Sequence, residues 1–404
     1  MAEWQYTIIH HNLTILSLVF VIIFIVSTSN AFILAEGSSH YHFKTPNQMS
    51  LFPTNSKYHT NQGDGLKQHR RWLVVDFDGT CTEKDTTPLL PYLAAAYCST
   101  CHQRDKEDEK DLQNRLSQFK VLEDEYMRLL GETHTNLFSD NDEGGEEEVE
   151  SQSIHEVLHA LDDPSIQVTK MVSDSRLLGG LGHASSHEIS EILDDDKHNN
   201  IQVSLKDGCS DVLARILLNK PDAADMNQSS SNEPLCSGWS LAVLSINWCP
   251  SLIDAALIQP LLKKRRSILQ IEYCDTEIPV WSNRVDEEGV VLLEVPGALA
   301  KRDRIKELRR HIHENDESSG SSSIIIYVGD STTDLAALLE ADIGIIIGES
   351  SSIMAIAERY GVNIIPLKKQ VSSDSIESSR EKKILWQVDR WSEIDELLLE
   401  VDQA

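Results

Sequence analysis

Five short apolar runs alternate along the chain with segments whose apolar residues recur at helical spacing. The runs are 71–76, 240–245, 324–330, 343–348 and 363–367, and the segments with helical spacing are 207–218, 250–262, 301–313, 333–340 and 352–360. Buried apolar strands that alternate with helices are typical of a parallel sheet covered on both faces. The pattern therefore predicts an α/β core with a doubly wound, Rossmann-like parallel sheet.

The stretch between the first two runs has a different character. It is rich in charged residues, and its apolar positions predict helices over 108–130, 154–161 and 186–193. Its acidic run at 140–150 is typical of a solvated loop. We expect residues 86–203 to form a helical insertion after the first strand, and 70–85 with 204–370 to form the core. A linker and a final helix are expected in 371–404.

The segment before residue 70 does not follow this pattern. An apolar run at 13–26, extending less regularly to 35, fits a signal-peptide core or a signal anchor, although no Lys or Arg precedes it. Residues 37–62 lack acids and resemble a transit peptide in composition, except that they contain no Arg. We expect a targeting or anchoring segment over 1–36, with membrane contact through 13–35 as one outcome, and a flexible linker over 37–69. An organelle and the secretory route both stay open as destinations.

The overall charge limits the partners of the chain. Its 404 residues include 36 basic and 65 acidic side chains, a net charge of −29. This balance argues against nucleic-acid binding, which depends on basic patches. An anionic substrate is still compatible, because a bound divalent cation reverses the local field. The seven cysteines are odd in number and few for this length, so we expect mostly reduced thiols. The oligomeric state is open.

Two pairs of carboxylates stand at the carboxyl ends of predicted strands. Asp76 and Asp78 end the first run, and Asp330 and Asp334 follow the third. The carboxyl ends of parallel strands meet at the edge of the sheet where α/β proteins bind ligands. Like charges buried there are costly unless a cation or a proton lies between them. The pattern is typical of a nucleophile and a proton donor beside a hard divalent cation.

Two further side chains fit a phosphate site. Ser245 ends the second run just before the helix predicted at Pro250, and a hydroxyl near a helix amino terminus suits a phosphate oxygen. Lys301 lies at a helix start, where a cation is unfavourable for the helix dipole. Neutralising a phosphoryl group and the nucleophile would explain its position. Lys306 is the alternative, and we expect it on the exposed face of the helix.

Taken in this order, the motifs resemble the haloacid dehalogenase superfamily over about Trp72 to Leu367. The resemblance implies hydrolysis of a small phosphomonoester through an aspartyl-phosphate on Asp76, with Asp78 as general acid and then base and Lys301 as the catalytic lysine. It implies Mg²⁺ at Asp76, the Asp78 carbonyl and Asp330, with Asp334 in the same metal-binding motif. The insertion would then be a cap that closes over the substrate.

A closer resemblance is to the phosphatase half of the plant bifunctional thiamine-salvage family, which joins a TenA-type hydrolase to a phosphatase for thiamine monophosphate. It is carried by residues 76–85, 206–209, 244–249, 327–331 and 341–352. It implies thiamine monophosphate as substrate and a mitochondrion or plastid as location. We expect no TenA part in this chain.

The residues expected to bind substrate lie near these motifs. Thr80, Ser245 and Asn247 are predicted at the phosphate. Trp248 would stack on a ring of the leaving group and Asp85 would favour a cation, while a core tryptophan and a turn aspartate are the alternatives. A phosphatase for another small metabolite and a non-catalytic binding protein of the same fold are the competing functions.

Overall fold

The computed structural model describes residues 71–102, 108–138, 153–195, 201–218, 239–271, 277–315, 323–367 and 384–403. The chain divides into two units, Met1–Asp64 and Gly65–Ala404, and every described residue lies in the second. The predicted targeting segment, the linker before residue 70 and the acidic run at 140–150 fall outside the described residues. Among the helices in the ranges above, none is long and apolar enough to cross a membrane.

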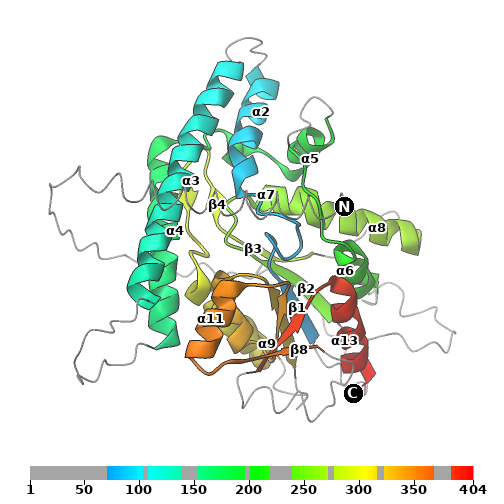
Figure 1. Cartoon of the computed structure of the whole chain (residues 1–404). Coiled ribbons are helices and arrows are strands. Elements are labelled where there is room, and N and C mark those ends of the chain that lie inside the picture. Colours follow the sequence, from blue (N-terminus) through cyan, green and yellow to red (C-terminus); the bar gives the residue numbers. More distant parts are fainter. Residues whose placement is uncertain are drawn as a thin grey trace, which may run out of the picture. The chain divides into compact units, whose positions relative to one another are not determined.

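A parallel sheet forms the core of this unit (Figure 1). Within the described ranges it has seven strands in the order β3-β2-β1-β6-β7-β9-β8, and every neighbouring pair is parallel. The predicted fold class is therefore confirmed, and the five predicted strands are all present. The strands are β1 (Arg71–Val75), β2 (Trp239–Leu244), β3 (Val280–Trp281), β6 (Ile324–Gly329), β7 (Ile343–Ile347), β8 (Asn363–Pro366) and β9 (Ile384–Val388).

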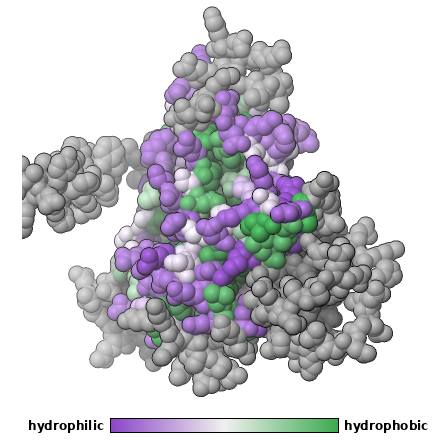
Figure 2. All heavy atoms as spheres, turned by 90° about the vertical axis from the view of Figure 1, so that its right-hand side faces the viewer, coloured by the Kyte–Doolittle hydropathy of each residue, from purple (hydrophilic) through white to green (hydrophobic). Residues whose placement is uncertain are grey.

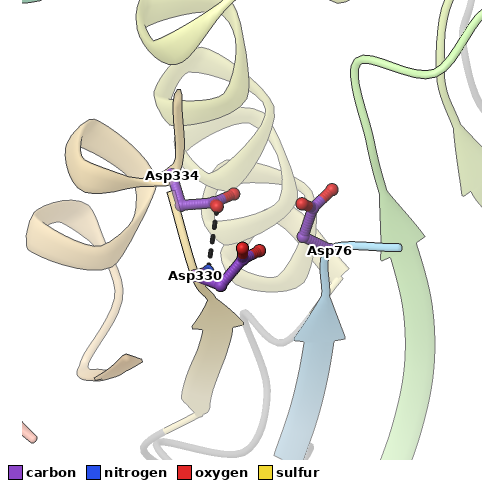
Figure 3. A group of neighbouring side chains, drawn as sticks. All are labelled: Asp76, Asp330 and Asp334. Atoms are coloured by element: carbon purple, nitrogen blue, oxygen red, sulfur yellow. Dashed lines mark hydrogen bonds between the residues drawn. The ribbon is translucent and has the colours of Figure 1, made fainter. Parts of the chain in front are cut away.

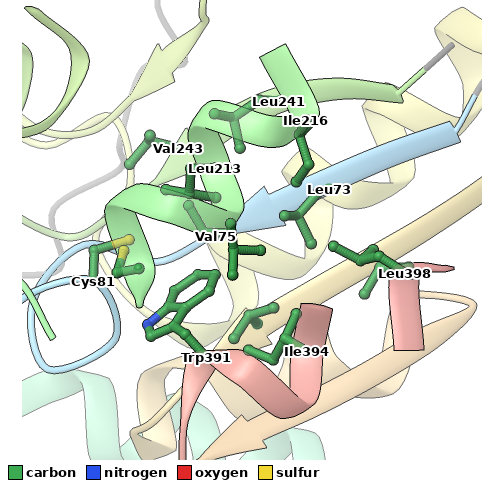
Figure 4. Packing of buried hydrophobic residues seen from close by; sticks show 14 of the residues in the cluster. Leu73, Val75, Cys81, Leu213, Ile216, Leu241, Val243, Trp391, Ile394 and Leu398 are labelled. Atoms are coloured by element: carbon green, nitrogen blue, oxygen red, sulfur yellow. The ribbon is translucent and has the colours of Figure 1, made fainter. Parts of the chain in front are cut away.

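Helices cover both faces of the sheet. Alternate residues of a strand point to opposite faces, so Leu73 and Val75 pack with α6 and α13, while Val74 packs with α9, α10 and α11. Figure 4 shows the first of these layers, with Trp391 of α13 beside Val75. The helices are α6 (Cys209–Leu218), α7 (Pro250–Ile253), the π-helical turn η5 (Asp254–Ile258), α8 (Gln259–Leu269), α9 (Ala298–Asn315), α10 (Leu335–Glu340), α11 (Ser351–Arg359) and α13 (Trp391–Gln403).

Four α-helices lie between β1 and α6 in the described part of the sequence, and we call them the helical insert. They are α2 (Leu90–His102), α3 (Asp108–Phe138), α4 (Ile154–Ser175) and α5 (Ser186–Asp194). The three predicted helices are present, α3 and α4 are longer than expected, and α2 was not predicted. The insert shares an apolar cluster with α7 and with a hairpin of β4 (Arg284–Val285) and β5 (Val291–Leu292). The limits 86–203 stay a prediction for this region.

The strand register brings three chain segments to one edge of the sheet. Val75 pairs with Val243 of β2 on one side and with Val328 of β6 on the other. The residues after these three strands therefore emerge side by side. Because the chain goes from β1 to β2 on one side and reaches β6 on the other, this edge is a topological switch point, where open α/β sheets bind ligands.

Candidate active site

A buried lysine lies between two buried carboxylates at this edge. Asp76 directly follows β1 and is 3% exposed, and Lys301 in the first turn of α9 is fully buried. The Lys301 Nζ atom is 3.0 Å from Oδ1 of Asp76 and 2.7 Å from Oδ1 of Asp334. Figure 3 shows the carboxylates of Asp76, Asp330 and Asp334 gathered at the ends of β1 and β6. The structure therefore brings together four of the predicted site residues.

Asp334 is held by hydrogen bonds on both of its oxygens. Oδ1 accepts from Lys301 Nζ and from the Tyr327 hydroxyl, each at 2.7 Å. Oδ2 accepts from the amides of Asp330 (3.1 Å) and Ser331 (3.0 Å) and from the Ser331 hydroxyl (2.9 Å). Burial opposes ionisation, but Lys301 and these donors hold the pKa of Asp334 below its usual value. Asp334 is thus a fixed anion that orients Lys301.

Asp330 has a different environment. Its Oδ1 accepts a hydrogen bond from the Thr80 hydroxyl at 2.7 Å. Burial, followed by the negative charge of Asp334, raises the pKa of Asp330 to about 6. Gly79 has a positive φ of 70°, and a Cβ there would lie 2.3 Å from Oδ2 of Asp330. Only glycine therefore lets the turn after β1 pass this close to the carboxylate.

The carboxylates of Asp76, Asp330 and Asp334 fit a hard divalent cation. Each offers an oxygen within 4.8 Å of the others. Burial raises the pKa of Asp76 well above its usual value, and the charges of Asp334 and Asp330 add to this effect against Lys301. A cation would remove that repulsion, and carboxylate oxygens are the ligands that Mg²⁺ prefers. Because Asp334 is already saturated by hydrogen bonds, Asp76 and Asp330 are the better placed ligands.

Asp78 is held by neutral donors instead of a lysine. Its Oδ1 accepts from both the amide and the hydroxyl of Thr86, each at 2.7 Å, and its Oδ2 accepts from Asn247 Nδ2 at 2.8 Å. Burial raises the pKa of Asp78 and the charge of Asp85 raises it further, while the Thr86 and Asn247 hydrogen bonds lower it. The two carboxylates of the first motif thus have different electrostatic environments, as a nucleophile and a proton donor require.

The other predicted binding residues have varied surroundings. Ser245 is fully buried, and its Oγ accepts from the Asn247 amide at 3.2 Å. Asp85 is exposed and accepts from the Thr87 amide at 2.8 Å, as a turn aspartate does. Trp248 is only 9% exposed and packs in the apolar cluster of the insert, as a core tryptophan does. Lys306, the alternative to Lys301, was expected on the exposed face of the helix. Its side chain is half-exposed and lies near Glu340.

Sequence reasoning missed three residues that shape the site. Thr86 holds Asp78, Tyr327 holds Asp334, and Asp162 of the insert accepts from the amide of Ala298 at the start of α9. Tyr327 carries a usable signal, because it is the one polar side chain in an otherwise apolar strand run that ends at Asp330. Thr86 and Asp162 are ordinary turn and helix residues in the sequence, and no pattern singles them out.

A cavity of about 620 Å³ lies away from these carboxylates. It is a partly open hollow lined by α5, residues 202–204 and the helical stretch from η5 to α8, and its lining includes Lys263 and Arg266. Figure 2 views the molecule from the side on which α5 and α8 lie in Figure 1, and shows apolar residues beside hydrophilic ones on that face. The predicted site residues do not line this cavity.

No family model matches the chain. The chain is similar to a plant protein. It is 25% identical over 352 residues to the Bifunctional TH2 protein, mitochondrial, of Arabidopsis thaliana, and the match covers 83% of this chain. It covers 50% of the plant protein, so the chain spans about half the length of this curated relative. The match confirms the resemblance to the plant bifunctional family that the motifs predicted.

Solved structures of phosphoserine phosphatases are also similar to the chain. One is a phospho-aspartyl intermediate analogue, with a TM-score of 0.35 and 14% identity over 81% of this chain and 98% of that one. A substrate-bound complex has a TM-score of 0.33 and 13% identity over 72% of this chain and 91% of that one. A phosphoserine phosphohydrolase-like protein from Francisella tularensis has a TM-score of 0.31 and 12% identity, covering 81% and 99%.

Proposed function

We propose that the chain is a magnesium-dependent phosphatase for small phosphomonoesters, with Asp76 as the nucleophile. The observation that carries this proposal is the buried Lys301, 3.0 Å from Asp76 and 2.7 Å from Asp334 at the switch point of a parallel sheet. A fully buried ammonium beside a buried carboxylate provides positive charge where a phosphoryl group would sit. The similarity to the Bifunctional TH2 protein supports the same reading.

The proposed reaction has two steps. A carboxylate oxygen of Asp76 attacks phosphorus, the bond from phosphorus to the leaving oxygen breaks, and Asp78 gives its proton to that oxygen. Asp78 then takes a proton from water, whose oxygen attacks phosphorus and releases phosphate and the free Asp76 carboxylate. The raised pKa of Asp78 favours the protonated form that the first step needs. Burial raises the pKa of Asp76, and the charge of Lys301 acts against this rise and so favours the ionised nucleophile.

Several side chains would bind and orient the phosphoryl group. Ser245 places its hydroxyl directly after β2 and Thr80 places its hydroxyl in the turn after β1, and Asn247 links Asp78 to the segment after β2. Asp76 and Asp330 would hold Mg²⁺ together with the Asp78 carbonyl, with Asp334 positioned behind them. The bound ion would neutralise the negative charge of the phosphate and the carboxylates.

Thiamine monophosphate is the proposed substrate. The similarity to the plant bifunctional protein supports it, and so does Asp85, whose negative charge acts on Asp78 at the site and would favour a cationic leaving group. The name of the relative also supports an organelle as the location of this chain. The competing proposals are a phosphatase for another small metabolite and a binding protein without turnover.

Phosphate release tests these alternatives. Protein that starts near Gln68 would be assayed with Mg²⁺ and a panel of phosphomonoesters that includes thiamine monophosphate. Asp76→Asn should abolish release, and Lys306→Ala, on the exposed face of the same helix as Lys301, is the matched control that should retain it. Release from thiamine monophosphate alone would support the substrate, and release only from other esters would discard it. A folded protein inactive on the whole panel would contradict the phosphatase proposal.

A further inference from the structure

The helix that carries Lys301 receives its amino-terminal cap from the insert. α9 follows Pro296 and Gly297, and neither residue has a side chain that can accept a hydrogen bond from the first turn. Oδ1 of Asp162 accepts from the Ala298 amide at 3.0 Å, although Asp162 lies 136 positions earlier in the chain. The backbone of Leu299 also hydrogen-bonds to this carboxylate. A side chain of α4 thus satisfies the free amides of a core helix.

Gly297 makes room for this contact. A Cβ on Gly297 would lie 2.1 Å from Cγ of Asp162, closer than two atoms can approach. The φ angle of Gly297 is not in the left-handed region, so the backbone itself would accept alanine. The position of the Asp162 carboxylate, and not backbone strain, is therefore what excludes a side chain here.

The contact lies within one helical turn of Lys301. An ammonium group near a helix amino terminus is opposed by the helix dipole, and a carboxylate at that end compensates for it. Burial raises the pKa of Asp162 to about 6, while the amides of Ala298 and Leu299 and the charge of Lys301 act against this rise and favour the carboxylate. Asp162 thus stabilises both the first turn of α9 and the charge that this turn carries.

Further contacts dock α4 on α9. Leu158 of α4 is 1% exposed and belongs to the apolar cluster that includes Ile305 and Leu308 of α9. Arg302 of α9 lies 3.4 Å from Nδ1 of His155. The Asp162 hydrogen bond is therefore part of a packed interface and not an isolated surface contact.

We propose that Asp162 is a positioning residue: with α4 docked, it fixes the first turn of α9 and thereby places the Lys301 ammonium between Asp76 and Asp334. This inference rests on the proposed function and deepens it. The insert then completes the active site, because the position of the lysine depends on a residue that the insert supplies.

Substitutions at both ends of the contact test the role. Asp162→Ala should lower kcat about tenfold, the order expected when a cap is lost, and should leave KM within about twofold. Asp162→Asn should restore most of kcat, because its side-chain oxygen still accepts the amide hydrogen bonds. Gly297→Ala should reproduce the loss by displacing Asp162, and the double variant Asp162→Ala/Gly297→Ala should be no worse than either alone. Asp163→Ala, at the exposed neighbouring position on α4, is the control.

Amide hydrogen exchange tests the same contact with a measurement that does not depend on catalytic activity. In the full-length chain, the amides of Ala298 and Leu299 should exchange faster in Asp162→Ala and Gly297→Ala than in the unmodified protein and in Asp163→Ala. Unchanged exchange together with unchanged kcat would overturn the inference. A large rise in KM with constant kcat would also overturn it, because Asp162 would then act in substrate binding. Faster exchange in a protein that hydrolyses no ester would leave the capping contact in place and reject the proposed function.

Discussion

At the scale of single residues, the site separates carboxylates that look alike in the sequence. Asp76 faces the ammonium of Lys301, whereas Asp78, two positions later, receives only neutral donors from Thr86 and Asn247. Asp334 is saturated by hydrogen bonds and its pKa is lowered, whereas burial and charge repulsion raise the pKa of Asp330. Partner groups, and not residue type, thus assign the proposed roles of nucleophile, proton donor, metal ligand and anchor.

Substitutions at two neighbours of Asp78 should shift the pH profile of the proposed reaction in opposite directions. The charge of Asp85 raises the pKa of Asp78, so Asp85→Asn should lower it and move the alkaline limb of kcat/KM to lower pH. The Thr86 hydroxyl lowers this pKa, so Thr86→Val should move the same limb to higher pH. Rate profiles measured at saturating Mg²⁺ check both. Shifts in the same direction would argue against Asp78 as the proton donor.

Metal binding should be visible in thermal stability. A ligand that binds only the folded state raises the melting temperature, and a divalent cation would relieve the repulsion between Asp76, Asp330 and Asp334. Mg²⁺ should therefore raise the Tm of the unmodified protein, chelation should reverse the rise, and Asp330→Asn should abolish most of it. Thermal unfolding with and without Mg²⁺ is the measurement. An equal rise in Asp330→Asn would place the ion elsewhere.

At the scale of elements, hydrogen bonds from several parts of the chain hold the loop after β1 in place. The two connections between core and insert pair with each other, since the Glu83 amide donates to Ser204 O at 2.9 Å and the Lys206 amide donates to Cys81 O at 2.8 Å. From the other side, Nε1 of Trp391 in α13 donates to Thr80 O at 3.1 Å. The turn that carries Asp78 is thereby held by the insert connections and by the last helix.

Trp391 should be among the most sensitive positions for stability. It is fully buried and packs in the same cluster as Val75 and Leu213. Trp391→Ala should lower the free energy of unfolding by about 3–5 kcal/mol, the range for large aromatic truncations in a core. Trp391→Phe should cost less, because it keeps most of the ring volume and loses only the hydrogen bond to Thr80. Denaturant unfolding compares the two, and equal losses would mean that the hydrogen bond dominates.

At the scale of the whole described unit, the last described segment, residues 384–403, supplies a strand of the sheet and a helix that covers it. β9 pairs with β7 on one side and with β8 on the other, so β8 reaches the sheet only through β9. A cluster on one face of the sheet includes both β1 and α13. The segment from 384 onward is therefore integral to the core and not an appended tail.

Truncation tests this arrangement. A chain that ends at residue 370 should lose cooperative unfolding, because β8 has no partner strand and Trp239, Val243 and Leu73 lose the α13 layer that covers their cluster. A chain that starts at residue 68 is the control and should unfold cooperatively, since the described unit begins near this point. Circular dichroism during thermal unfolding compares them. Cooperative unfolding of the shorter chain would show that β9 and α13 are dispensable.

Much of the core could be predicted from the sequence, because a strand that is buried on both faces of the sheet consists of consecutive apolar residues, which can be recognised without knowing the fold. Strands inside a parallel sheet need continuous apolar runs, so β1, β2, β6 and β7 were recognisable, and the acids after the runs of β1 and β6 marked the edge with the site. The prediction of β8, a mostly exposed edge strand, depended on its short run of Ile364 and Ile365. The run of β9 was instead assigned to a linker and final helix, and β3, with only two residues, leaves almost no pattern. A single strand or helix with a strong apolar pattern can therefore be predicted from its own stretch of sequence.

Only the tertiary structure decided which side chains meet. The strand order places β6 and not β3 beside β1, and this brings Asp330 next to Asp76. The partners of Asp78 come from positions 86 and 247, and the cap of α9 comes from position 162. Such contacts join residues of ordinary type across long sequence separations, and they form because packing and electrostatics act on distance in space. The sequence by itself therefore determined the elements and the chemistry available at their ends, and the packed structure decided the partners that give each carboxylate its proposed role.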